Sequence, residues 1–149
     1  MREILFRGKT LDNTNWKYGY YVKQYGAEQI YLPDGTDREY GFDCYHIIPE
    51  TIGQYTGLTD KNGTKIFEGD IVKSVYRLKQ VNGVSEREIR SSIEYGVGWA
   101  YSEVYGVLQR FRDGSGVALL SVMQGTNIAD CEVIGNIHDN PELLKEREG

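Results

Sequence analysis

The stretch QYTGLTDKNGTKIFEGDIV, residues 54–72, decides the fold of this chain because it sets turn-forming residues between short apolar runs. Its centre holds Asn62-Gly63, and both of these residues accept left-handed backbone dihedrals, which predicts a chain reversal. Ile71 and Val72 then begin a strand with an apolar face. The pattern is typical of β-strands joined by tight turns.

The acidic residues of this stretch also favour turn chemistry over acid–base or metal chemistry. They are Asp60, Glu68 and Asp70. An Asp that opens a turn usually accepts hydrogen bonds from nearby backbone N–H groups. We therefore expect these three residues to stabilise turns.

Composition favours one mostly β domain. The chain has 149 residues, 40% apolar and 26% charged, and it contains 18 glycines and 12 tyrosines. Glycine is costly inside helices, and aromatic residues suit half-buried strands. A chain of this length buries enough surface to fold without metal or disulfide support, so we expect a single domain over residues 1–149.

Charge and hydropathy indicate which classes of partner and which cellular compartment to expect. The net charge of -5 disfavours general nucleic-acid binding, which depends on Lys and Arg. No window reaches the roughly 18 apolar residues of a membrane span, and the first ten residues lack the apolar core of a secretory signal. We expect a cytoplasmic protein with no membrane partner. Cys44 and Cys131 are then expected to be buried thiols.

The N-terminal third has the pattern of short strands between turn formers. The strands are expected at residues 3–7, 16–23 and 29–32. The second has large apolar side chains at every other position, namely Trp16, Tyr18, Tyr20 and Val22, which is typical of a half-buried strand. The prediction is an antiparallel meander over residues 1–49, with a possible second lobe over residues 50–149.

A long hairpin is predicted where residues 71–81 turn at Asn82-Gly83 into residues 83–95. It would bring basic and aromatic residues together in a possible binding surface. That surface comprises Lys73, Tyr76, Arg77, Lys79 and Arg90. It suits nucleic acid or an acidic protein. The alternative is a solvated strand whose charges prevent edge-to-edge aggregation.

The C-terminal part is predicted to contain strands at residues 116–122 and 131–137. Asn140 can cap a helix with Pro141 at its first position, so a helix of about two turns is expected over residues 142–148. The glycine-rich residues 95–107 are left unassigned.

Cysteine, histidine and glycine clusters provide weak signals for chemistry. Cys44, His46, Cys131 and His138 contain the elements of a zinc set, but their spacing fits no common finger or ribbon. Cys44 and His46 lie too far apart along a strand for a direct hydrogen bond. The GVG at 96–98 and the GSG at 114–116 belong to no complete phosphate-loop motif and favour hairpin turns. No catalytic, metal or cofactor residues are predicted.

Three segments together resemble the YopX family of phage and prophage proteins. They are MREILFRG at 1–8, IGQYTGLTDKNGTKIFEGDIV at 52–72 and CEVIGNIHDNPELL at 131–144. The resemblance implies a mostly β protein with an SH3-like barrel portion, expected within residues 50–149, and a phage or prophage origin. It supplies no activity, cofactor or site residue.

The resulting hypothesis is a noncatalytic protein-interaction module that acts in the bacterial host. Its expected partner is a host or phage protein, or a second copy of the chain. One alternative is a nucleic-acid-associated regulator that uses the basic hairpin. The other is an unrecognised hydrolase built on Cys44 and a histidine.

Overall fold

Antiparallel strands dominate the computed structural model, which describes residues 4–33, 44–99, 103–111, 117–119 and 131–144. Contacts within the chain define two compact units, Met1–Gly57 and Leu58–Gly149. Helical structure in the described residues is limited to the 3-10 turns η2 (Pro49–Thr51) and η3 (Pro141–Leu144). The prediction of a mostly β protein is confirmed, whereas the possible lobe boundary at Pro49 stays a prediction.

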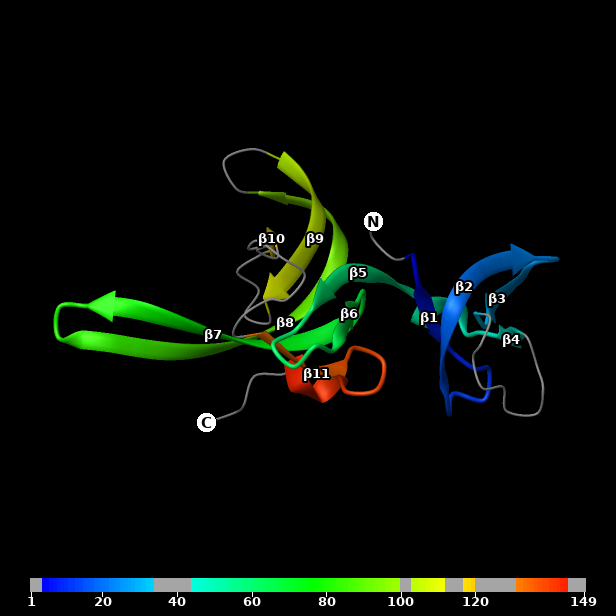
Figure 1. Cartoon of the computed structure of the whole chain (residues 1–149), viewed down its shortest axis with the longest axis horizontal. Helices are drawn as coiled ribbons and strands as arrows, with labels where there is room; N and C mark the ends of the chain where they lie inside the picture. Colours follow the sequence, from blue (N-terminus) through cyan, green and yellow to red (C-terminus); the bar gives the residue numbers. More distant parts are fainter. Residues whose placement is uncertain (1–3, 34–43, 100–102, 112–116, 120–130, 145–149) are drawn as a thin grey trace. The chain divides into compact units, whose positions relative to one another are not determined.

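The first unit is built around an antiparallel meander. Its strands are β1 (Phe6–Lys9), β2 (Trp16–Gln24), β3 (Ala27–Tyr31) and β4 (Cys44–His46), each paired with the next (Figure 1). The start of β5 (Gly53–Thr59) pairs with β1, and a β-bridge joins Thr10 to Ile47 beyond β4. Ile30 and Ile47 are buried. The predicted meander is confirmed.

The burial pattern of β2 differs from the expected one. Its burial alternates, but Tyr18 and Tyr20 are 45% and 54% exposed, and the neighbouring Gly19 is buried. A Cβ atom on Gly19 would lie 2.0 Å from the backbone oxygen of Tyr31. The chain itself therefore occupies the glycine side of the strand, and the tyrosines face solvent.

The second unit contains an open five-stranded sheet in the order β10-β9-β8-β7-β11. Its strands are β7 (Asp70–Gln80), β8 (Gly83–Trp99), β9 (Glu103–Phe111), β10 (Val117–Leu119) and β11 (Cys131–Asn136). The short strand β6 (Lys65–Phe67) follows β5 and pairs with it. The core cluster consists of Leu58, Ile66, Val72, Ile93 and Cys131.

The predicted long hairpin is confirmed. Strands β7 and β8 pair from Ile71↔Ser92 to Gln80↔Gly83, and Gly83 has a φ of 131°. Figure 1 shows this ribbon extending past β11 on its way to the turn. Between β7 and β11, the register shifts at Val133/Gly135. The predicted strand near residues 131–137 is also confirmed.

Two glycine segments, at residues 96–98 and 114–116, were predicted to form hairpin turns. Gly96 and Gly98 lie within β8, where they pair with Gly106 and Val104 of β9. The GVG at 96–98 is therefore strand and not a turn, because the β8–β9 ladder continues through both glycines. The GSG at 114–116 lies outside the described residues, which resume at Val117.

The barrel and the C-terminal helix are not confirmed. Among the described strands, neither sheet closes into a barrel, so the SH3-like barrel stays an implication of the resemblance. Where a helix was predicted, the structure has only the 3-10 turn η3, and residues 145–149 lie outside the described part. The Oδ1 of Asn140 accepts the N–H of Asn136 at 3.3 Å, and its backbone carbonyl accepts the N–H of Leu143 at 3.0 Å.

Candidate functional site

The carboxylate of Asp60 organises the turn at the centre of residues 54–72. Asp60 is buried, and its Oδ1 accepts the N–H groups of Asn62 and Thr64, each at 2.9 Å. Its Oδ2 accepts the N–H of Val133 in β11 at 2.9 Å. The predicted turn role is confirmed, and the same side chain also joins the turn to a distant strand.

Asp70 has a similar local role at the next turn. Its Oδ2 accepts the N–H of Phe67 at 2.7 Å in a buried position. Gly69 has a φ of 91°, and its N–H donates to the carbonyl of Ile93 at 2.8 Å. Glu68 lies in this turn and is half-buried. The acidic residues are therefore parts of the turns that join β5, β6 and β7.

Cys131 has the environment of a structural thiol. It is buried in the core of the second unit. Burial raises the pKa of this thiol to about 11, and the charge of Asp60 also raises it, whereas a hydrogen bond with Ser74 opposes the rise. Only a thiolate is a good nucleophile or metal ligand. Near neutral pH Cys131 is thus a packed thiol.

Cys44 and His46 belong to the first unit, whereas Cys131 and His138 belong to the second. On β4, the strand rise separates Cys44 from His46 by roughly 7 Å, and the His46 Nε2 lies 3.4 Å from the Nε2 of Gln29. In the part of the chain that the structure describes, no three His, Cys, Asp or Glu side chains gather as metal ligands would. The hydrolase alternative stays a prediction.

The predicted basic surface lies on the β7–β8 ribbon, where Lys73 is directly opposite Arg90. The other predicted members occupy the register pairs Tyr76↔Arg87, Arg77↔Glu86 and Lys79↔Val84. Of these pairs, Arg77↔Glu86 joins a basic to an acidic residue, whereas Lys73↔Arg90 joins two basic residues.

Lys73 and Arg90 both have partners inside the second unit. The Nζ of Lys73 is 3.6 Å from Glu132 Oε2. The Nε of Arg90 is 3.3 Å from Glu88 Oε1, and its Nη1 donates to the carbonyl of Leu143 at 3.4 Å. These contacts reduce the positive charge at this end of the surface, and the surface stays a prediction.

The β2–β3 hairpin presents an aromatic side chain that sequence reasoning missed. Its turn consists of Tyr25 and Gly26, with φ values of 53° and 76°. Tyr25 is 98% exposed. A non-glycine residue in the left-handed region costs roughly 1–2 kcal/mol. The Tyr-Gly pair between two predicted strands was the available signal.

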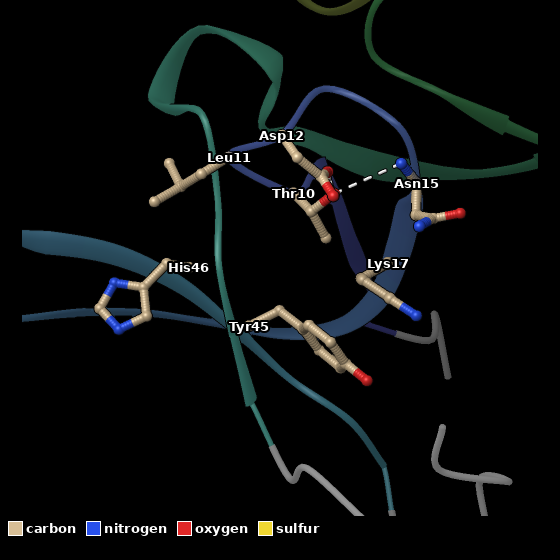
Figure 2. Close-up of a pocket in the computed structure, with 7 residues that line it drawn as sticks. All are labelled: Thr10, Leu11, Asp12, Asn15, Lys17, Tyr45 and His46. Carbon is tan, nitrogen blue, oxygen red and sulfur yellow. Dashed lines mark hydrogen bonds between the residues drawn. The ribbon is translucent and has the colours of Figure 1, made fainter. Parts of the chain in front are cut away.

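A pocket of about 340 Å³ lies between the β1–β2 loop and β4 in the first unit (Figure 2). Its lining residues are Thr10, Leu11, Asp12, Asn15, Lys17, Tyr45 and His46. The Lys17 ammonium lies 4.4 Å from the centre of the Tyr45 ring. Figure 2 shows these two side chains next to each other, with the His46 ring pointing away from them. The pocket thus combines an aromatic wall with a cation.

The loop beside the pocket is held by its own side chains. Asp12 accepts hydrogen bonds from the Thr10 hydroxyl, from the Thr14 N–H at 3.1 Å and from the Thr14 hydroxyl at 2.7 Å. The hydrogen bonds from Thr10 and Thr14 lower the pKa of the Asp12 carboxyl. Asn13 adopts a φ of 61°, which Asn tolerates better than most residues. Asp12 therefore gives the pocket a fixed negative charge.

These features define an antiparallel β protein of two units with an aromatic hairpin and a small amphipathic pocket. The family model described as YopX protein matches residues 5–145, so the chain belongs to the YopX family. Among solved structures, the chain is similar to the crystal structure of protein EF1440 from Enterococcus faecalis. That match has 23% identity, covers 97% of this chain and 100% of the other, and has a TM-score of 0.48.

No curated protein matches the chain. In the described residues, no helix has the length and apolar character needed to cross a membrane.

Proposed function

We propose that this protein is a noncatalytic protein-interaction module, encoded by a phage or prophage and acting in the cytoplasm of the bacterial host. The YopX family resemblance supports the phage or prophage origin. The observation that carries the interaction role is the position of Tyr25, which is almost fully exposed in a left-handed conformation.

Tyr25 destabilises the turn that it occupies. The left-handed backbone is unfavourable for tyrosine, and an exposed ring recovers little energy from packing within the chain. Asn or Gly would form this turn more readily. Tyrosine is enriched in protein interfaces and among the residues that dominate binding energy. Tyr25 is therefore better explained by a contact with another protein.

The same hairpin offers further contact area. Tyr18 and Tyr20 are exposed on β2, and Tyr20 is directly opposite Tyr31 on β3. Rigid aromatic side chains gain contact area at a low cost in conformational entropy. The hairpin thus forms an aromatic surface with Tyr25 at its tip.

Affinity capture from a prophage-bearing host tests this proposal. We expect tagged full-length protein to retain a stoichiometric partner and the Tyr25→Asn variant to lose most of it. Tyr25→Phe is the matched control, since it keeps the ring, and it should retain the partner. Equal recovery with wild type and Tyr25→Asn would contradict the role of this surface.

Nucleic-acid association is the second candidate, and the cross-strand pair Lys73 and Arg90 is the observation that favours it. Their contacts with Glu132 and Glu88 oppose it, because phosphate would have to compete with these carboxylates. A mobility-shift titration with single- and double-stranded DNA and RNA at low and moderate salt is the test. The absence of a shift at micromolar protein would exclude this candidate.

A further inference from the structure

We infer that the protein forms a two-fold dimer in which Tyr25 of each copy enters the pocket of the other copy's first unit. This inference rests on the proposed function, because it assigns Tyr25 to a protein contact and identifies the partner as a second copy of the chain. It follows from the match between one exposed side chain and one pocket.

Within one copy of the chain, the Tyr25 side chain does not fill this pocket. Tyr25 is 98% exposed, so its ring is not inserted in a pocket of its own chain. It follows the last residue of β2, whereas Lys17 of the pocket lies near the first residue of that strand. Tip and Lys17 are thus at opposite ends of β2, and His46, which also lines the pocket, is paired with Gln29 of β3.

The lining of the pocket suits a tyrosine. Leu11 is 64% exposed, and the Tyr45 ring forms part of the wall, so an inserted ring would find apolar neighbours. The loop's own hydrogen bonds use the Oδ1 of Asp12, and its Oδ2 is a polar acceptor for a phenol hydroxyl. Burial of such an amphipathic side chain is favourable when its hydroxyl finds a partner.

The pocket is large enough for an aromatic side chain. Its volume of about 340 Å³ lies at the low end of the range for small-molecule sites. Interface energy is often concentrated where a single aromatic anchor fills a pocket of this kind.

Two-fold symmetry then gives a closed assembly. In an isologous interface, residue i of one copy contacts residue j of the other, and the reverse contact forms at the same time. Two copies placed with their β2 strands in opposite directions would bring each tip toward the other's pocket. The interface would contain two equivalent insertions and leave neither pocket open for a third copy.

Sedimentation equilibrium of the full chain tests the dimer. We expect wild type to dimerise, and Tyr25→Asn and Leu11→Asp each to raise the dissociation constant by at least about tenfold. Both substitutions lie at exposed positions, and Asn suits the backbone at residue 25, so folding is retained. Val81→Ser removes an exposed apolar side chain of the second unit and should leave the constant nearly unchanged.

Mixing the two variants gives a more specific result. The Tyr25→Asn copy keeps its pocket, and the Leu11→Asp copy keeps its tyrosine, so a mixture restores one insertion of the two. We expect a mixed dimer that is tighter than the self-association of either variant.

Two outcomes would overturn the dimer. One is a wild-type protein that stays monomeric up to about 1 mM, and the other is unchanged dimerisation of Tyr25→Asn. If wild type is monomeric while Tyr25→Asn loses a captured host partner, the proposed function stands and the tyrosine contacts a different protein. If dimerisation depends on Tyr25 and no host partner is captured, self-association is the function of this surface.

Discussion

The carboxylate of Asp60 accepts the backbone N–H of Val133 at 2.9 Å, across 73 positions of the sequence. The neighbouring Lys61 donates its N–H to the carbonyl of Cys131 at 2.9 Å. The turn after β5 is thus joined to β11 by two hydrogen bonds next to the core of the second unit. Because Asp60 is buried, water cannot replace these partners.

Replacing Asp60 by Ala should strongly destabilise the protein. The substitution removes the acceptor for the N–H groups of Asn62, Thr64 and Val133. We expect the free energy of unfolding to fall by about 3 kcal/mol, measured by urea denaturation. Asp12→Ala is the matched control, because that carboxylate also binds its own loop but is exposed. A similar loss in both variants would contradict the importance of the bond to β11.

Replacing Tyr25 by Asn should stabilise the protein. Asn tolerates the left-handed conformation better, and no buried contact is lost, so the free energy of unfolding should rise by about 1 kcal/mol. Thermal or urea denaturation measures this, at a concentration low enough to keep the protein monomeric. Tyr20→Asn should have the opposite sign, because Asn is unfavourable within a strand. Destabilisation by Tyr25→Asn would show that the ring packs within the chain.

Replacing Gly8 by Ala should disrupt packing in the first unit. A Cβ atom at this position would lie 2.2 Å from Cγ2 of Ile47. We expect the free energy of unfolding to fall by about 2 kcal/mol, as for other overpacked cores. Removing the clash with Ile47→Ala should make the double variant less destabilised than the sum of the single changes. Strict additivity in denaturation experiments would contradict this contact.

The raised pKa of Cys131 predicts slow alkylation and a stability that falls at alkaline pH. The folded thiol holds its proton up to a pKa of about 11, whereas the unfolded thiol ionises near its ordinary value. The unfolded state therefore loses protons first, and stability decreases as pH rises between these two values.

Iodoacetamide labelling with mass spectrometry measures the alkylation, and Cys44, which is only half-buried, is the internal comparison. We expect Cys44 to react first in the folded protein and both thiols to react similarly in denaturant. In Cys131→Ala, the contribution of this thiol to the alkaline loss of stability should disappear. Equal labelling rates in the folded protein would contradict its burial.

Local chemistry made much of the fold predictable. The turn at Asn62-Gly63 and the hairpin at Asn82-Gly83 lie where these dipeptides occur, and in each of them the glycine has the positive φ, 81° at Gly63 and 131° at Gly83. The N-terminal meander followed from alternation and turn residues over short distances. The C-terminal helix is not confirmed: the structure has the 3-10 turn η3, and the Oδ1 of Asn140 accepts the N–H of Asn136.

The candidate site was less predictable. The pocket brings the loop from Thr10 to Asn15 next to Tyr45, and nothing in the local pattern specifies that approach. The exposed face of β2 was also misjudged, because the close approach of Tyr31 to Gly19 decides which side is covered. The β7–β8 register places Lys73 opposite Arg90. Contacts with other segments give Lys73 a partner in Glu132 and Arg90 a partner in the carbonyl of Leu143.

By itself, the sequence determined the β class, the main turns, the family resemblance and the turn role of Asp60, since each depends on neighbouring residues. Tertiary structure alone decided that Asp60 also holds β11, that Tyr25 is left exposed and that a pocket forms beside Lys17 and Tyr45. Such features depend on which distant segments come into contact. The free energy of those contacts is set by packing and register, which no local stretch of sequence encodes.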